Sequence, residues 1–258
     1  MKYSICLASF LIVSVIVPHA SGAGDSLLSG EEIRQKCLHR LEGRHFTATV
    51  LLTLNRDGRQ EKRKVLVWRD DEGGRERLMA RFEEPFDLRG VGLLYIQNLD
   101  RPNDYFVYQP ATGRVRRIAE TLAREDIYGI DLEFLGFGFG HGELADVESV
   151  DYELLDGRRL LRFTQRAQSP NARFDRETTW VDPSTYLPIQ TLHYLHGEVV
   201  LRAHTEEVKL VQGIPTPIRL SFNRAAKQET VSLSVEHIDY EAVIPEVYFS
   251  TLALVQKR

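Results

Sequence analysis

The feature that most constrains the fold of this chain is an alternation of apolar and polar residues with a period of two. In segment 45–55, Val50 and Leu52 fall on one face, and Asp57-Gly58 then turns the chain. Further predicted strands, most of them alternating in the same way, are 65–68, 78–83, 93–97, 105–108, 147–155, 159–165, 173–181, 189–195, 199–211, 218–223 and 230–240. Short strands at regular spacing predict a mainly β chain of consecutive antiparallel strands rather than βαβ units.

A single helix is predicted before the first strand. Ser29 and Glu32 have the spacing of a capping box, which starts a helix by satisfying its first free backbone N–H groups. Ile33, Cys37 and Leu41 then recur on one face. We expect this apolar stripe to pack on the sheet, with Cys37 buried and unreactive.

The N-terminus has the pattern of a secretory signal peptide. Lys2 precedes an uncharged, mostly apolar run over residues 5–17, and small residues at 21–23 provide a cleavage site after Ala23. A membrane-spanning helix needs roughly 20 apolar residues, and Pro18 ends this run too early. We therefore expect residues 1–23 to be removed and the protein to enter the periplasm.

The mature chain, residues 24–258, is expected to be one soluble domain. Cys6 leaves with the signal peptide, so Cys37 has no partner for an intramolecular disulfide. Cys6 also precedes the apolar run, so it does not have the position of a lipidation cysteine, and we expect no lipid anchor. Barrels of this length commonly form a single domain.

The charge of the chain argues against a nucleic-acid partner. The formal net charge is −4, and loss of Lys2 makes it one unit more negative. Nucleic-acid-binding domains are typically strongly basic. The basic runs at 60–64 and 114–117 are short, and solvated strand edges explain them as well as phosphate contacts do.

Three predicted strands, 65–68, 93–96 and 105–108, are apolar on both faces. One face can lie under a helix and the other can line a second apolar layer or a cavity. An ordinary sandwich core produces the same pattern. Periodicity alone does not separate these two arrangements.

Segment 119–143 interrupts the meander and is rich in glycine and aromatic residues. A long segment of this kind in a compact domain is usually a functional lid or disordered, and glycine-separated aromatics favour a mobile apolar lid. The residues we assign to the lid are Ile127, Tyr128, Leu132, Phe134, Phe137 and Phe139.

No motif of catalysis, metal binding or cofactor binding is present. The chain lacks G-x-S-x-G, H-E-x-x-H and C-x-x-C patterns. His193 and His196 lie three apart on a predicted strand, so they point to opposite faces, and surface or turn positions explain them better than a metal site. We therefore predict no enzyme activity, no metal and no cofactor.

Four motifs in order resemble one protein family. They are Phe82-Glu-Glu-Pro85 with Asp87-Leu-Arg-Gly90 and Leu93-Leu94; Tyr108-Gln-Pro110-Ala111 with Arg116-Arg117-Ile118; Trp180-Val-Asp182 with Tyr186-Leu187-Pro188; and Gly213-Ile214-Pro215-Thr216-Pro217. Together they resemble the outer-membrane lipoprotein-sorting-like proteins, relatives of the periplasmic carrier LolA. The family's Gly-Ser-Asp stretch and acidic short helix are replaced here by Gly129-Ile130-Asp131 and the glycine-phenylalanine run.

The resemblance implies a single incomplete, half-open antiparallel β-barrel of about eleven strands, with an apolar cavity and a helical or loop lid. Relatives carry acyl chains of lipids or lipoproteins across the periplasm, often alongside inner-membrane exporters of the resistance-nodulation (RND) type. The expected function is therefore transfer of such a cargo from an inner-membrane exporter to an outer-membrane acceptor.

The residues expected to line the cavity are Val65, Val67, Trp68, Phe82, Leu94, Tyr95, Phe106, Tyr108 and Trp180. A register error of one residue inverts this assignment, because neighbouring side chains point to opposite faces. Arg116 and Arg117 can hold the lid or meet a lipid headgroup, and exposed strand-edge charges explain them equally well.

Two other functions stay open. The same fold can serve a periplasmic sensor or regulator that detects envelope lipids or proteins and signals to a membrane partner. A hydrolase with a site assembled from distant strands is the third possibility, and it would require carboxylates or histidines clustered in a cleft.

Overall fold

The structure is a computed structural model, and it describes residues 28–41, 44–71, 74–119, 128, 135, 144–168 and 172–256. The expected signal peptide, residues 1–23, lies outside these ranges. Among the described residues no helix is long and apolar enough to cross a membrane.

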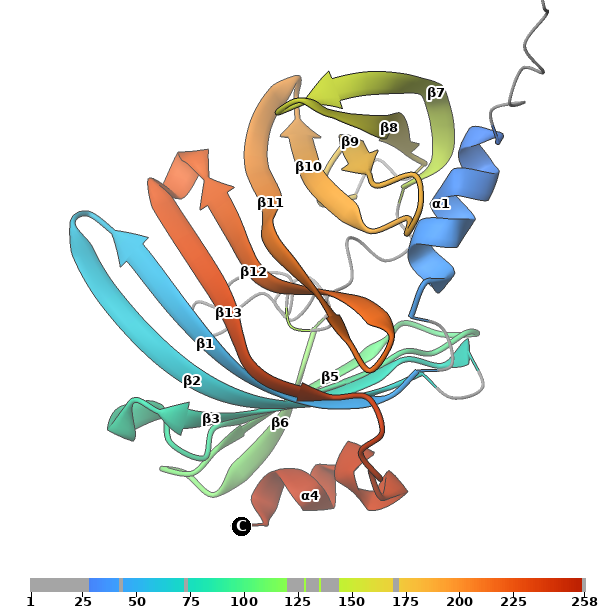
Figure 1. Ribbon diagram of the computed structural model, residues 1–258. Coiled ribbons are helices and arrows are strands. Elements are labelled where there is room, and N and C mark those ends of the chain that lie inside the picture. The colour runs from blue at the N-terminus through green and yellow to red at the C-terminus, as the bar shows by residue number, and fades with distance from the viewer. Residues whose placement is uncertain are drawn as a thin grey trace, which may run out of the picture.

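In the described ranges, thirteen antiparallel strands form one curved sheet that does not close into a barrel (Figure 1). The strands are β1 (Phe46–Arg56), β2 (Arg59–Asp70), β3 (Arg77–Glu84), β4 (Gly92–Ile96), β5 (Asp104–Gln109), β6 (Arg114–Ile118), β7 (Leu144–Leu155), β8 (Arg158–Ala167), β9 (Arg176–Val181), β10 (Pro188–Leu195), β11 (Glu198–Val211), β12 (Ile214–Arg224) and β13 (Glu229–Asp239). Their order is β6-β5-β4-β3-β2-β1-β13-β12-β11-β10-β9-β8-β7. The first strand therefore pairs with the last, and β6 and β7 are the two edges.

The predicted half-open, mainly β fold is confirmed, with thirteen strands in place of about eleven. Strand β6 was not among the predicted strand segments, because its short sequence is mostly charged, although a solvated strand edge was one explanation of the basic run 114–117. It is an edge strand, where charged residues are tolerated and discourage pairing with other chains.

The predicted N-terminal helix is α1 (Gly30–His39). The Glu32 backbone N–H donates to Ser29 Oγ at 3.3 Å, and the Ser29 backbone N–H donates to the Glu32 carboxylate at 2.8 Å. Ile33 is wholly buried against Leu161 and Phe163 of β8, so the helix packs on the sheet as expected. Burial raises the pKa of the Cys37 thiol to about 12, which makes this cysteine a poor nucleophile.

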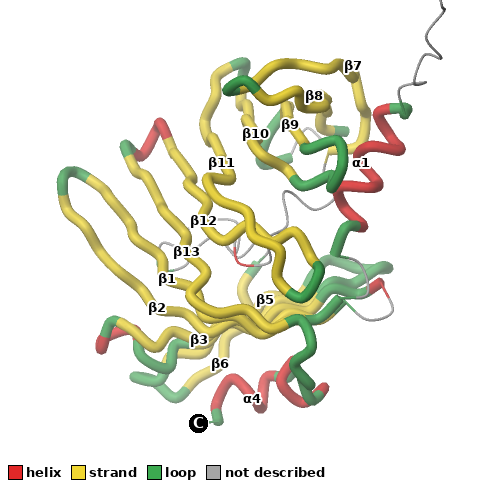
Figure 2. Tube along the Cα trace, viewed as in Figure 1, coloured by secondary structure: helices red, strands yellow, loops and turns green. Residues whose placement is uncertain are grey.

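A second helical segment closes the described chain. It contains a short 3-10 turn, η4 (Glu246–Phe249), and the helix α4 (Thr251–Val255), which begins where Ser250 Oγ accepts from the Ala253 N–H at 3.3 Å. Figures 1 and 2 show it beneath β3 and β6, on the outside of the curved sheet. This helix was not predicted, because five residues are too few for a helical period to be recognised.

Candidate functional site

The inner, concave face of the sheet carries a continuous row of apolar side chains. Its members are successive partners across five strands: Ala48 of β1, Val67 of β2, Ala80 of β3, Leu93 of β4 and Val107 of β5. Each is no more than 8% exposed. Residues two apart on a strand share a face, so the row is repeated at the neighbouring positions of each strand.

The same apolar face continues across the β1–β13 pairing to β11. Leu54 of β1 lies opposite Val231 of β13, Val231 lies opposite Phe222 of β12, and Phe222 lies opposite Ala203 of β11. All of these side chains belong to one hydrophobic cluster with the row described above. The concave face is therefore apolar without interruption from β5 to β11.

Two described residues of segment 119–143 lie on this face. Leu135 is wholly buried in the same cluster, and the ring of Tyr128 meets Phe82 edge-on at a centroid distance of 6.0 Å. The Tyr128 hydroxyl also accepts a hydrogen bond from the Gln109 side chain. Five of the predicted lid residues, Ile127, Leu132, Phe134, Phe137 and Phe139, lie outside the described residues.

At β8–β10 the concave face carries a buried polar cluster beside the apolar residues that α1 covers. The Glu177 carboxylate accepts from Thr179 Oγ1 at 2.9 Å and from the Gln165 amide at 3.3 Å, and its second oxygen lies 3.1 Å from His193 Nδ1. The Phe174 ring stacks on the His193 imidazole at 4.5 Å. The Glu177 carboxylate is therefore hydrogen-bonded while buried, whereas His193 Nδ1 has no hydrogen-bond partner in the part of the chain that the structure describes.

The two histidines singled out by sequence occupy different environments. His193 is buried at 6% exposure beside Glu177, so its expected surface or turn position was wrong. His196 lies exposed in the turn after β10, with a left-handed φ of 53°. In the ranges that the structure describes, no group of three or more His, Cys, Asp or Glu side chains is placed to hold a metal ion.

The structure separates the residues expected to line one cavity. Val65, Val67, Phe82 and Tyr95 lie together in the concave cluster. Trp68, Leu94, Phe106 and Tyr108 lie on the opposite, convex face against the C-terminal segment, and Trp180 lies in a third cluster with Leu160 and Leu187. These strands are apolar on both faces, so alternation fixes which residues share a face but not which face is inward.

Several residues of the concave face were missed. They are Ala48, Leu52, Ala80, Leu93, Val107, Leu220, Phe222 and Leu233. Within β3 the signal was available, because Ala80 is two residues from Phe82 and must share its face. No comparable local signal joins Leu220 or Phe222 to β2, since they meet only through the pairing of β1 with β13.

The predicted arginine pair is divided between the faces of the edge strand β6. Arg116 shares a face with Ile118, which packs against the concave cluster. Arg117 turns to the other face, where its Nη2 lies 2.6 Å from Asp104. Arg117 therefore has a carboxylate partner on the sheet itself.

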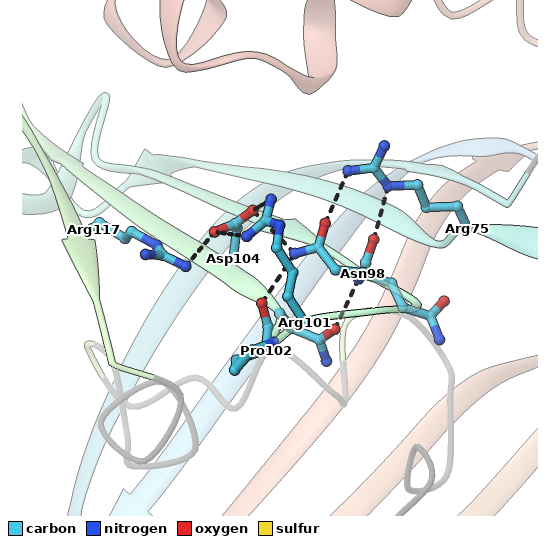
Figure 3. Close-up of polar contacts among 8 residues, drawn as sticks. Arg75, Asn98, Arg101, Pro102, Asp104 and Arg117 are labelled. Carbon is cyan, nitrogen blue, oxygen red and sulfur yellow. Dashed lines mark hydrogen bonds and ion pairs between the residues drawn. The ribbon is translucent and has the colours of Figure 1, made fainter.

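Asp104 is the centre of a polar network at the start of β5 (Figure 3). Its carboxylate accepts two hydrogen bonds from Arg101, at 2.5 and 3.0 Å, and one from the Asn98 amide at 3.0 Å. These bonds, Arg101 foremost, lower the pKa of Asp104 to about 2. Arg75 extends the network by donating to the Asn98 side chain at 3.0 Å.

The convex face carries a groove of about 710 Å³ between β2, β3 and the C-terminal segment. Trp68, Met79, Tyr108 and Tyr248 contribute to its lining. Phe86 stands at the groove with 84% of its surface exposed. This groove is separate from the concave apolar face, because its floor is formed by the opposite side chains of the same strands.

Solved structures with the same fold include three relatives. A DUF1329 family protein from Desulfovibrio piger superposes with a TM-score of 0.79 and 19% identity, over 87% of this chain and 97% of that one. A putative outer membrane lipoprotein-sorting protein domain from Vibrio parahaemolyticus gives 0.79 and 18%, over 88% and 98% of the two chains. A LolA superfamily protein from Nitrosomonas europaea gives 0.69 and 15%, over 88% and 99%.

Sequence comparison adds a family assignment. No curated protein matches the chain. Residues 74–256 match a family model described as "-like: Uncharacterized protein", a range that includes every strand from β3 to β13. The chain therefore belongs to that family, and it has the fold of the lipoprotein-sorting proteins of the LolA superfamily, as the order of its sequence motifs predicted.

Proposed function

We propose that this protein is a periplasmic carrier that shields the acyl chains of a lipid or lipoprotein on its concave face. One observation carries the proposal: the concave face is apolar without interruption from β5 to β11. The fold shared with a lipoprotein-sorting protein domain and a LolA superfamily protein supports it. In this proposal the protein is a binding protein and not an enzyme.

The size of the hydrophobic effect explains why a carrier needs so large a surface. An acyl chain in water costs about 0.8 kcal/mol per exposed CH₂ group, so most of its length must be covered. Apolar contact is not directional, so an acyl chain can replace a side chain that makes the same kind of contact. Leu135 makes such contacts on the concave face, and Tyr128 adds a single hydrogen bond to them.

The route of the cargo is part of the same proposal. A cleaved signal peptide at residues 1–23 would place the chain in the periplasm. There it would receive cargo from an inner-membrane exporter of the RND type and deliver it to an outer-membrane acceptor. This direction rests on the family resemblance and on the sorting function named for the relative from Vibrio parahaemolyticus.

A sensor or regulatory binding protein of the same fold is the alternative. The convex groove favours it, because Phe86 and Val247 stand there 84% and 49% exposed, and exposed apolar patches often mark protein contacts. In that case a stable protein complex, and not a lipid, would accompany the chain.

Native mass spectrometry with organic extraction tests the carrier proposal on protein purified from its own periplasm. We expect a bound lipid or acylated peptide in the wild type. Val67→Asp, which puts a charge on the concave face, should lose it, while Leu66→Asp on the opposite face of β2 should keep it. A wild-type protein that carries no lipid and binds no apolar fluorophore would refute the proposal and favour the sensor.

A further inference from the structure

At the tips of the hairpins β1–β2 and β12–β13, the concave face changes from apolar to charged side chains. Along β1 the inward positions run from Leu52 and Leu54 to Arg56. Along β12 they run from Phe222 to Arg224, and Glu229 of β13 lies opposite both arginines. The apolar rows therefore end in a charged rim beside the apolar surface, on hairpins that lie side by side (Figure 1).

Glu229 forms ion pairs with both arginines, Arg56 and Arg224. Its carboxylate is wholly buried, accepts from Arg224 Nη1 at 2.9 Å, and forms an ion pair with Arg56. The Arg224 side chain is only 8% exposed, so its guanidinium is held at the boundary of the apolar face and not in bulk water. Held guanidinium groups are prepared to meet a further anion at little cost in conformational entropy.

Arg63 of β2 is a third arginine on the inward face, four residues along the β1–β2 pairing from Arg56. It lies opposite Leu52 and shares the inward face with Val65, and its side chain is only 11% exposed. Nη2 donates to Glu61 at 2.7 Å. Nη1 is buried, and no hydrogen-bond partner for it exists in the part of the chain that the structure describes. A buried donor without a partner is costly, so Nη1 marks a place where an acceptor from a ligand is favoured.

The charges of the two hairpin tips are unbalanced on this face. By strand alternation the inward positions there hold four arginines, Arg56, Arg59, Arg63 and Arg224, against the two glutamates Glu61 and Glu229. We name these four arginines the arginine rim. A guanidinium presents its N–H donors in a planar fork that matches the oxygens of a phosphate group.

We propose that the arginine rim binds the phosphate-bearing headgroup of an acyl lipid whose chains lie on the concave face, with Arg63 Nη1 donating to a phosphate oxygen. This inference rests on the proposed carrier function and adds to it the chemical class of the cargo. An anionic lipid has apolar acyl chains and a charged headgroup. The apolar concave face would take the chains, and the arginine rim would take the headgroup.

Displacement of a neutral fluorophore separates the two parts of the proposal. The full chain is loaded with N-phenylnaphthylamine, which reports the apolar surface, and titrated with lysophosphatidylglycerol or a neutral monoacylglycerol of the same chain length. We expect the anionic lipid to displace the probe at about tenfold lower concentration, the size of one charge-assisted hydrogen bond. Arg63→Gln should reduce this preference to about threefold or less.

The matched control is Arg219→Gln. Arg219 lies on β12 with its side chain on the opposite face, 2.8 Å from Glu207, and its replacement should leave the preference unchanged. Inorganic phosphate alone is the second control. Strong displacement of lysophosphatidylglycerol by free phosphate at equal concentration would show that the rim is a free-anion site and overturn the headgroup assignment.

The outcomes of the titration distinguish failure of the carrier proposal from failure of the headgroup assignment. If neither lipid displaces the probe, or the probe does not bind, the carrier proposal itself fails. If both lipids displace it equally, the carrier survives and the arginine rim does not bind the headgroup. Should Arg63→Gln not fold, ionic strength serves on the wild type. Raising it from about 0.01 M to about 1 M shortens the Debye length from about 30 Å to about 3 Å, and a preference that does not shrink overturns the inference.

Discussion

The two faces of strands β2–β5 are equally apolar and yet differ in how they are covered. Leu93 and Leu94 are neighbours on β4, and both are wholly buried. Leu94 lies on the convex face under the C-terminal segment, while Leu93 lies in the concave cluster. On these strands, burial alone does not distinguish a permanent core from a surface that a ligand can occupy.

Hydrogen bonds and close packing distinguish the C-terminal segment, which covers the convex face, from the residues that lie on the concave face. Arg81 of β3 donates to the carbonyl oxygens of Ala253 and Gln256, both at 2.6 Å, and so holds the end of α4 on the convex face. Gly92 lets that helix approach closely, since a Cβ there would lie 2.7 Å from Leu254 Cδ2. Directional bonds and close fit specify one partner, whereas apolar contact alone accepts many.

The largest effect is expected from truncating the two leucines of β4. Leu93→Ala and Leu94→Ala should each lower the free energy of unfolding by about 2–5 kcal/mol, because each removes a fully buried side chain. Only Leu93→Ala should change the binding of an apolar fluorophore, and only Leu94→Ala should expose the C-terminal segment to proteolysis. Urea unfolding, fluorophore titration and limited proteolysis check this. Equal effects of both variants on fluorophore binding would erase the distinction between the faces.

The anchor of the convex cover is tested by Arg81→Gln. Loss of its hydrogen bonds to the α4 carbonyls should cost about 1.5–3 kcal/mol, the range for bonds that involve a charged group. Hydrogen exchange should rise in residues 246–256 and stay unchanged in α1. The exposed Arg114 of β6 provides the control, since Arg114→Gln should change the stability by less than about 0.5 kcal/mol. An unaltered exchange rate in α4 would show that apolar contact alone holds this segment.

Gly92→Ala probes the close fit of the same helix. The added methyl group must displace the buried tip of Leu254, at a cost of about 1 kcal/mol, the low end of the range for overpacking. The midpoint of urea unfolding should fall, while fluorophore binding on the concave face stays at the wild-type value. A variant as stable as the wild type would mean that α4 adjusts freely and fits less specifically than we infer.

A pH-dependent effect is expected at Asp104, at the edge of these strands. Its pKa is lowered in the folded state to about 2 from the usual 3.8, chiefly by hydrogen bonds from Arg101. A lowered folded-state pKa stabilises the protein above about pH 3.8, and this stabilisation is lost as the pH falls through about 2. Asp104→Asn should therefore be less stable than the wild type at pH 7, and the difference should disappear near pH 2.

Urea midpoints of both proteins at pH 7, 4 and 2 measure this convergence. Asp151→Asn is the control, because Asp151 is exposed and Arg162 Nη1 lies 3.9 Å from its carboxylate. A difference between wild type and Asp104→Asn that persists unchanged at pH 2 would contradict the role of the ionised carboxylate.

Local patterns in the sequence were sufficient for much of the fold. Ser29 and Glu32 form the predicted capping box, and the turns at Asp57-Gly58 and Asp156-Gly157 lie between paired strands as expected. Both turns use positive φ angles, which suit these residues. These features depend on residues close together in the chain, so sequence reading can recognise them.

Local patterns could not assign the residues of the candidate site to one face of the sheet. Val65 and Val67 lie in one cluster with Phe82, whereas Trp68, which was expected to line the same cavity, lies on the other face of β2. Both faces of β2 are apolar, so nothing within the strand tells which neighbour will cover it. His193 is a second example, because its burial depends on Glu177 of the adjacent strand.

The sequence by itself determined the alternation within each strand, the positions of the turns and the start of α1, because these follow from backbone geometry and nearby side chains. Only the tertiary structure decided which apolar face turns inward, since that depends on the pairing of β1 with β13 and on the docking of α4 against β3 and β4. It also placed Arg56, Arg63 and Arg224 on the inward face of neighbouring strands. Long-range pairing sets these choices, and a period of two leaves the inward face undetermined.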